Sequence, residues 1–392
     1  MIIKEADRLS SVSTYYFATK LKQVAQMNQD GGSPVINLGI GSPDLNPPRG
    51  AVERLISSSS DEGVNKYQSY AGIPKLRQAF SGWYGRHFSV QMDADSEILP
   101  LIGSKEGIMH ISMAFLNPGD EVLVPNPGYP AYSAVSKLCG ATVVEYALKE
   151  EHAWLPDLDA LSSQNLDKVK IMWLNYPHMP TGARASTAFF KEVVSFAREH
   201  NILLCHDNPY TFILNQDPMS IFQVEGAREV CLELTSLSKN YNMAGWRVGA
   251  VAGGEEYLQT ILKFKSNMDS GMYRGLQEAA VEALSQGEAW HDRLNSIYEK
   301  RKKVALEIMD ILGCTYDADS VGLFIWGRVP FFIEEAESLT ERLLLGSRVF
   351  ITPGHIFGDQ GSKYIRISLC ATIDQLEQAK GRIVETLKST EV

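Results

Sequence analysis

The residues with the clearest chemical potential follow short apolar runs of the kind that form strands. Asp207 comes two residues after the run NILLC, Ser236 and Lys239 follow ELT, and Arg247 lies eight residues beyond the lysine. A turn at residues 103–105 (Gly-Ser-Lys) follows ILPLI and leads into a helical pattern. Ligand sites in open α/β sheets lie at the carboxyl ends of the strands, so we expect these residues to meet at one site.

Together these groups match the requirements of pyridoxal phosphate. A lysine forms a Schiff base with this cofactor, and an acid keeps the pyridine nitrogen protonated so that the ring can accept electrons. The helix after Gly103 offers free backbone N–H groups to the phosphate, and Ser236 and Arg247 add hydroxyl and guanidinium donors. Each residue alone also fits a plain structural role, such as a helix cap or a surface charge, and only the set favours the cofactor.

Three other kinds of site are disfavoured. Ser236 and Lys239 also satisfy the S-x-x-K motif of serine β-lactamases, but the accompanying S-D-N and K-T-G strings do not occur. The eight histidines form no H-E-x-x-H motif and the cysteines no C-x-x-C motif, so we expect no metal site; His206 is expected to support Asp207 instead. Neither G-x-G-x-x-G nor a P-loop is found.

The elements that must position these residues are predicted from the apolar runs. Seven runs between about Glu97 and Phe264 are expected to be strands: EILPLI, EVLVP, ATVVEY, KVKIMWL, NILLCHD, EVCLELT and RVGAVAG. Several are apolar nearly throughout, as expected of strands covered by helices on both faces. Helical patterns such as residues 187–200 lie between them. The sequence therefore predicts an α/β fold with a mostly parallel sheet.

The pattern changes after about Asn267, where a long helical stretch through Leu312 is followed by short strands (LFIWG, SRVFI, YIRISL) alternating with helices. A chain of 392 residues is long enough for two domains. We expect a large cofactor-binding α/β domain over residues 45–270. Residues 1–44 with 271–392 are expected to form a smaller α+β domain.

The composition limits which binding partners and which cell compartment we expect. The net charge of −10 argues against binding nucleic acid or anionic membranes, and no apolar run of about eighteen residues occurs. Charged residues occupy the N-terminus where a secretory signal would be apolar. Five widely spaced cysteines are expected to be buried thiols. We therefore expect a cytoplasmic protein with small-molecule partners.

Five stretches, in the same order along the chain, resemble the class I/II aminotransferases, which are pyridoxal phosphate enzymes of fold type I. They are YQSYAGIPKLRQAF, PNPGYPAY, DNPY, SLSKNYNMAGWRVG and YIRIS, and the resemblance runs from about Tyr15 to the C-terminal helix. It implies a large domain with a mostly parallel seven-stranded sheet and a smaller α+β domain. It also implies ping-pong transfer of an amino group between an amino acid and a 2-oxo acid.

The resemblance implies a role for each catalytic residue. Lys239 forms the Schiff base and moves the substrate proton, which requires a pKa well below its ordinary value. Asp207 pairs with the ring nitrogen, and Tyr210 bonds the ring hydroxyl.

Further residues are implied to bind the cofactor and the substrate. Arg366 clamps the substrate α-carboxylate, with Gly41 in a turn beside it. Tyr67 reaches the phosphate from the neighbouring subunit, which implies a homodimer with shared active sites. The remaining cofactor-binding residues are Tyr129, which stacks on the ring, and Ser104, Lys105, Ser236 and Arg247, which hold the phosphate.

One position departs from the family pattern. The family usually has asparagine directly before Pro-Thr-Gly, and this chain has Met179. That asparagine donates to the ring hydroxyl, whereas a thioether cannot donate a hydrogen bond. The hydroxyl would then depend on Tyr210, on His178 or on a water, and the pKa of the cofactor chromophore would rise.

The sequence restricts the substrate and the reaction type less closely than it restricts the cofactor. The strings LIGSKEGIMH and INLGIGSPD, together with Tyr15, resemble the LL-diaminopimelate aminotransferase branch, in which Tyr15 touches the substrate. Relatives acting on alanine, aspartate or methionine share much of these strings. A pyridoxal phosphate-dependent lyase or decarboxylase on the same fold is the alternative. A DNA-binding regulator would need a separate basic segment, and no residues remain for one.

Overall fold

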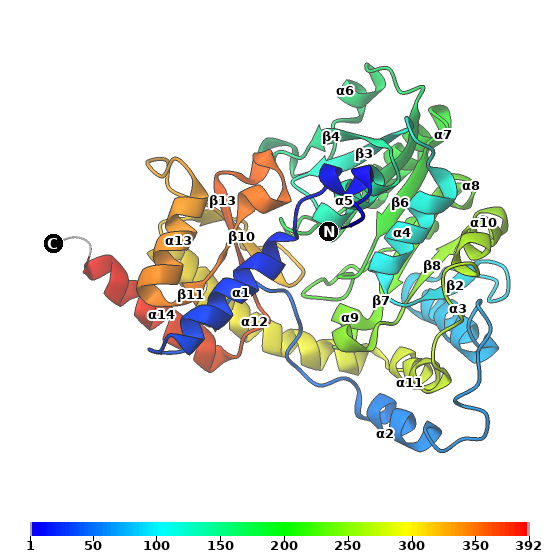
Figure 1. Ribbon diagram of the computed structural model, residues 1–392, viewed down its shortest axis with the longest axis horizontal. Coiled ribbons are helices and arrows are strands. Elements are labelled where there is room, and N and C mark those ends of the chain that lie inside the picture. The colour runs from blue at the N-terminus through cyan, green and yellow to red at the C-terminus, as the bar shows by residue number, and fades with distance from the viewer. Residues whose placement is uncertain (1, 390–392) are drawn as a thin grey trace.

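A seven-stranded sheet occupies the larger part of the computed structural model, which describes residues 2–389 (Figure 1). Its strand order is β2-β8-β7-β6-β5-β3-β4. Strand β8 runs antiparallel to β2 and β7, and the other pairs are parallel. The strands are β2 (Ile98–Leu101), β3 (Glu121–Asn126), β4 (Thr142–Ala147), β5 (Val169–Leu174), β6 (Leu203–Asp207), β7 (Cys231–Ser236) and β8 (Gly249–Gly253). The predicted mostly parallel sheet is confirmed, and each predicted run overlaps one strand.

Helices cover both faces of this sheet, which explains its apolar runs. Successive strand residues point to opposite faces, so Met172 of β5 joins one core cluster while Ile171 and Trp173 join another. The first cluster includes side chains of α3 (Pro74–Phe88), α7 (Thr187–Glu199) and α11 (Arg274–Leu284). The second includes side chains of α4 (Ser104–Phe115), α5 (Pro130–Leu138) and α10 (Glu255–Lys265).

A smaller antiparallel sheet lies to the left in Figure 1, with strand order β12-β13-β10-β9. Its strands are β9 (Thr315–Tyr316), β10 (Phe324–Arg328), β12 (Thr352–Pro353) and β13 (Tyr364–Ser368). The helices of this part are α12 (Glu288–Ile311), α13 (Ala336–Ser347) and α14 (Ile373–Lys388). The long helical pattern predicted before Leu312 is two helices, α11 and α12, separated at residues 285–287.

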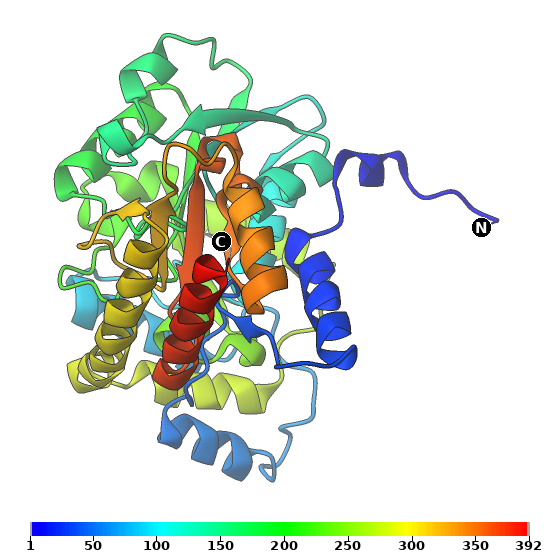
Figure 2. The same ribbon diagram turned by 90° about the vertical axis from the view of Figure 1, so that its left-hand side faces the viewer.

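Residues 16–37 pack against this smaller part (Figures 1 and 2), whereas residues 2–11 extend away from it, and residues 7–11 contact α5 of the larger part. Strand β1 (Ile36–Asn37) pairs in parallel with β11 (Val349–Phe350), and Val24 of α1 (Tyr16–Gln29) packs with Leu344 and Phe350. The division into domains at residues 45 and 270 stays a prediction. The remaining helices are α2 (Arg49–Ser58), α6 (Leu158–Ser162), α8 (Ala227–Val230), α9 (Leu237–Asn240) and the 3₁₀ turns η1 (Asp7–Ser11), η2 (Glu150–His152), η3 (Ile221–Gln223), η4 (Ala244–Trp246), η5 (Gly354–Phe357) and η6 (Asp359–Gly361).

Among residues 2–389, no helix combines the length and the apolar character needed to cross a membrane.

Candidate active site

A cavity of about 520 Å³ lies where the carboxyl ends of β6 and β7 face the smaller sheet and the N-terminal segment. This volume is within the range of about 300–1,000 Å³ typical of small-molecule sites. The structure brings every predicted site residue except Tyr67 to its wall. These residues are Tyr15, Gly41, Ser104, Lys105, Tyr129, Asp207, Tyr210, Ser236, Lys239, Arg247 and Arg366.

Lys239 extends into the cavity from α9, which begins directly after β7. Its Nζ donates a hydrogen bond to the carbonyl oxygen of Gly41 at 2.5 Å. Burial lowers the pKa of Lys239 below its ordinary value, and the positive charges of Arg366 and Arg247 lower it further. A larger fraction of this amine is therefore neutral and nucleophilic near neutral pH.

Asp207 ends strand β6 and has one occupied and one free carboxylate oxygen. The Tyr132 hydroxyl donates to Asp207 Oδ2 at 2.8 Å, while the buried Oδ1 has no hydrogen-bond partner among the described residues. Tyr132 is itself fixed by stacking on Trp173, with ring centroids 5.0 Å apart. Burial raises the pKa of Asp207 to about 6, and the Tyr132 hydrogen bond opposes this rise. A buried oxygen without a partner is costly, so this site favours a cationic donor in the cavity.

His206 makes no hydrogen bond to the Asp207 carboxylate, although its charge lowers the pKa of Asp207 and so supports the ionised form. His206 Nδ1 lies 2.8 Å from Glu233 Oε2, and its Nε2 lies 2.9 Å from the carbonyl oxygen of Tyr176. Neighbouring residues of a strand point to opposite faces, so the imidazole lies on the other side of the sheet from the carboxylate. Sequence reasoning missed Tyr132, although its spacing of one helical turn from Tyr129 was the available signal.

The N-terminus of α4 and the guanidinium of Arg247 meet at one end of the cavity. Gly103 has φ +83°, and a Cβ added there would lie 2.2 Å from Arg247 Nη2. Arg247 Nη1 donates to the carbonyl oxygen of Ala244 at 2.9 Å and lies 3.4 Å from Ser238 Oγ. Ser236 Oγ donates to Ser238 Oγ at 2.9 Å. With the free N–H groups of a helix start, these donors form an anion-binding pocket, in which sequence reasoning missed Ser238.

Arg366 of β13 is buried in a mostly apolar setting. Its guanidinium carbon lies 3.9 Å from the ring centroid of Phe324 and 4.5 Å from that of Phe357. Nη2 donates to the carbonyl oxygen of Gly39 at 2.7 Å, whereas Nε has no partner among the described residues. Burial lowers the pKa of Arg366 to about 10, so it stays charged at neutral pH. This buried cation with a free donor suits a substrate carboxylate.

Met179 lies against this arginine, with Arg366 Nη1 3.1 Å from its sulfur. Its backbone N–H donates to Asn175 Oδ1 at 2.8 Å, and Asn175 Nδ2 donates to the Asp207 carbonyl oxygen at 2.6 Å. Asn175 lines the cavity and was not predicted. Of the two side chains considered as substitutes for the missing asparagine, Tyr210 lines the cavity, while His178 is not among the lining residues and its Nδ1 lies 2.8 Å from Thr181 Oγ1.

The tyrosines of the site occupy different positions. The ring of Tyr15 lies 4.9 Å from the ammonium of Lys105 at the cavity wall. Tyr67 is 90% exposed and lies outside the cavity of its own chain. Its contribution to the site of a second subunit stays a prediction.

The residues present fit pyridoxal phosphate. The free Asp207 Oδ1 can accept from a pyridinium nitrogen, and the amine of Lys239 lines the same cavity. The pocket at the start of α4 can receive a phosphate. The fit rests on this set of donors and acceptors and on the unpartnered carboxylate oxygen.

Known proteins resemble this chain both in sequence and in fold. A family model described as aminotransferase class I and II matches residues 33–383. An LL-diaminopimelate aminotransferase from Nitratidesulfovibrio vulgaris is 39% identical over 97% of this chain and 98% of its own length.

Two solved structures are similar in fold and sequence. Apo-BacF from Bacillus subtilis has a TM-score of 0.94 and 35% identity, with 98% of each chain covered. An aromatic aminotransferase from Pyrococcus horikoshii has a TM-score of 0.86 and 28% identity, covering 95% of this chain and 99% of its own.

Proposed function

This chain belongs to the class I and II aminotransferases and is a pyridoxal phosphate-dependent aminotransferase, and we propose that the cavity containing Lys239 is its active site. This assignment rests on the presence of both Lys239 and Asp207 at the wall of one cavity. The pKa of the lysine is lowered, and one carboxylate oxygen of the aspartate has no hydrogen-bond partner among the described residues. Bound pyridoxal phosphate supplies an aldehyde for the substrate amine and a ring that accepts electrons.

Each residue then has one task in the proposed reaction. Arg366 binds the α-carboxylate of the amino acid and so fixes the orientation of its Cα–H bond. Lys239 Nζ removes the Cα proton, which its lowered pKa permits near neutral pH. Asp207 holds a positive charge on the ring nitrogen through its free oxygen. An amino acid and a 2-oxo acid use the same site in turn, which predicts ping-pong kinetics.

We propose LL-diaminopimelate as the amino donor. Full-length relatives carry the name of that aminotransferase. Tyr15, which the resemblance to that branch implies touches the substrate, lines the cavity. An amino acid with an apolar or aromatic side chain is a second candidate. It is favoured by the lining of the cavity, where Asp207 is the sole acidic residue among those described and Phe17, Leu21, Ile40, Phe324 and Phe357 contribute apolar surface.

An amino-acid panel against the purified holoenzyme distinguishes these donors. Absorbance follows conversion of the cofactor to its pyridoxamine form after each amino acid is added without an oxo acid. We expect LL-diaminopimelate to give the highest second-order rate constant. A higher value for phenylalanine or tyrosine would favour the second candidate. Release of ammonia or carbon dioxide without conversion would instead support the lyase or decarboxylase alternative.

We also propose a cytoplasmic homodimer with shared active sites and the division into domains at residues 45 and 270. The exposed Tyr67 supports a shared site, because this tyrosine lies outside its own cavity.

A further inference from the structure

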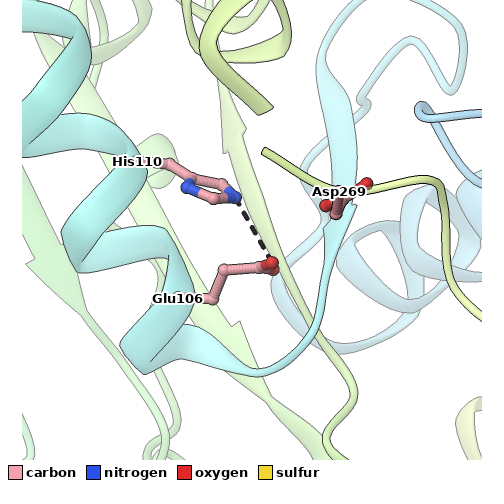
Figure 3. Close-up of side chains that lie close together, drawn as sticks. All are labelled: Glu106, His110 and Asp269. Carbon is pink, nitrogen blue, oxygen red and sulfur yellow. Dashed lines mark ion pairs between the residues drawn. The ribbon is translucent and has the colours of Figure 1, made fainter. Parts of the chain in front are cut away.

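A second group of chemically active side chains lies outside the cavity, between α4 and the segment that follows α10. It comprises Glu106 and His110 of α4 and Asp269, which Figure 3 shows, together with Lys265 at the end of α10. Figure 3 shows Glu106 and His110 extending together from α4 toward Asp269. One ligand atom from each of these three residues lies within 4.8 Å of the others. We call the four residues the α4–α10 cluster.

The cluster is buried and charged. His110 is 0% exposed and Lys265 is 2% exposed, while the side chains of Glu106 and Asp269 are 11% and 10% exposed. His110 Nε2 lies 3.3 Å from Glu106 Oε1, and neither ring nitrogen makes a hydrogen bond to a described residue. Buried charges are expensive unless they are paired. Because these charged side chains are nevertheless buried here, we expect them to have a role.

A divalent metal is the first role to consider, and the charges argue against it. Lys265 Nζ already binds Asp269 Oδ2 at 2.6 Å. The charges of Glu106, Asp269 and Lys265 sum to −1, so a divalent ion would leave a net positive charge beside a buried ammonium. Glu106 Oε2 and both oxygens of Asp269 already accept hydrogen bonds from the protein, although neither ring nitrogen of His110 has a hydrogen-bond partner among the described residues.

The partners of the two carboxylates show what the cluster holds. Glu106 Oε2 accepts from the backbone N–H of Ile102 at 2.5 Å, which fixes the turn leading to Ser104 and Lys105 at the cavity wall. Asp269 Oδ1 accepts from the backbone N–H of Gly271 at 2.9 Å.

Gly271 connects the cluster to the segment that carries Tyr67. A Cβ added to Gly271 would lie 2.6 Å from the carbonyl oxygen of Gln68 and 3.1 Å from that of Ser69, so the two backbones are in close contact. One end of the cluster is thus bonded to the turn at the cavity. The other end is bonded to the loop on which residues 67–69 rest.

We propose that Glu106, His110, Lys265 and Asp269 are positioning residues for the cofactor phosphate. Glu106 fixes the turn carrying Ser104 and Lys105, and Lys265 with Asp269 fixes the loop at Gly271 that contacts Gln68 and Ser69 beside Tyr67. A ring nitrogen of His110 lies within 4.8 Å of a carboxylate oxygen of Glu106 and of Asp269. This inference rests on the proposed function, in which Ser104 and Lys105 serve the phosphate of their own subunit and Tyr67 serves that of the partner subunit.

The test compares two aldehydes that differ only in the phosphate. The dissociation constants of pyridoxal phosphate and of pyridoxal are measured for the apoenzyme of wild type, His110→Leu, Glu106→Gln and Asp269→Asn. Glu106→Gln and Asp269→Asn keep an acceptor for their backbone N–H groups and remove one charge. His291→Leu is the matched control, because His291 is also buried, has no partner at either ring nitrogen among the described residues, and does not line the cavity.

We expect Glu106→Gln and Asp269→Asn to weaken pyridoxal phosphate binding about tenfold while pyridoxal binding stays as in wild type, because an amide oxygen accepts a weaker hydrogen bond than a carboxylate does. His110→Leu, which removes the pair with Glu106, should show a loss of the same kind, and His291→Leu should bind both aldehydes as wild type does. Equal losses for both aldehydes, or no loss, would overturn the proposal. So would a stoichiometric divalent metal that is absent from His110→Leu and whose removal by EDTA weakens cofactor binding. If His110→Leu does not fold, the near-isosteric Glu106→Gln and Asp269→Asn decide the question. Failure of wild type to bind pyridoxal phosphate would contradict the proposed function instead.

Discussion

At the scale of single residues, Asp207 divides its two carboxylate oxygens between the protein and the cavity. Tyr132 occupies Oδ2 at 2.8 Å and leaves Oδ1 without a partner among the described residues. Because Tyr132 is stacked on Trp173, it can hold the carboxylate in one orientation. Oδ1 is then available to a donor in the cavity without rearrangement.

Tyr132→Phe should make cofactor binding more sensitive to acid. The pKa of Asp207 is about 6, and the Tyr132 hydrogen bond lowers it. Asp207 must be ionised to pair with a cationic ring, so wild-type affinity for pyridoxal phosphate should fall as the pH drops through about 6. Without the hydroxyl this midpoint should move to higher pH. Titration of the dissociation constant against pH measures it.

Tyr146→Phe is the control, because Tyr146 is a buried tyrosine that bonds the Trp173 carbonyl oxygen and does not line the cavity. Equal midpoints in wild type and Tyr132→Phe would contradict the role given to Tyr132.

Met179→Asn should lower the pKa of the cofactor chromophore. The sulfur of Met179 can accept from Arg366 but cannot donate to the ring hydroxyl, whereas an asparagine amide can. The ring hydroxyl of the cofactor already makes one internal hydrogen bond. A protein donor that bonds the ionised hydroxyl in addition stabilises the ionised form and lowers the pKa of the chromophore. A pH titration of the visible absorbance of the holoenzyme gives the midpoint. Met179→Leu, which also lacks a donor, should titrate as wild type does, and an unchanged midpoint in Met179→Asn would reject the idea.

At the scale of elements, the turn from β2 into α4 depends on Gly103. Its φ of +83° and its contact with Arg247 both exclude a side chain. Gly103→Ala should cost about 1–3 kcal/mol of folding stability, because φ +83° with ψ 159° is a backbone conformation that essentially only glycine adopts. It should also displace Arg247, which weakens pyridoxal phosphate binding. Cofactor titration of the apoenzyme measures the loss.

Gly119→Ala isolates the backbone effect, because Gly119 has φ +91° and open space around an added Cβ. If Gly103→Ala binds the cofactor as tightly as Gly119→Ala does, Arg247 is not required at that position.

The strands of the large sheet were predictable because burial on both faces requires continuous apolar runs. The break between α11 and α12 was missed because the helical periodicity continues on both sides of residues 285–287. At the site, motif residues such as Lys239 and Arg366 could be found from spacing and resemblance. The roles of Tyr132 and Asn175 depend on contacts with Asp207, which is distant from both along the chain, so the sequence does not assign them. Ser238 contacts Ser236 and Arg247 within one motif and was overlooked. Motif spacing also does not show the α4–α10 cluster, in which Asp269 lies more than 150 residues from Glu106.

At the scale of the whole molecule, the proposed shared site predicts complementation between two inactive variants. In a hybrid dimer of Lys239→Ala and Tyr67→Ala subunits, one site carries both defects and the other carries neither. Random mixing makes half of the dimers hybrid, so about a quarter of wild-type activity should return. Activity of the mixture is measured after refolding together at limiting cofactor. No gain over the unmixed variants would place Tyr67 outside a partner's site.

The central claim is that Lys239 is the residue that binds the cofactor aldehyde. The holoenzyme is reduced with borohydride and digested, and mass spectrometry locates the modified residue. We expect one phosphopyridoxyl group on the peptide containing Lys239 and none after Lys239→Ala. Lys105 also lines the cavity, so a modification at Lys105, or an unmodified Lys239 peptide, would show that Lys239 does not bind the cofactor aldehyde.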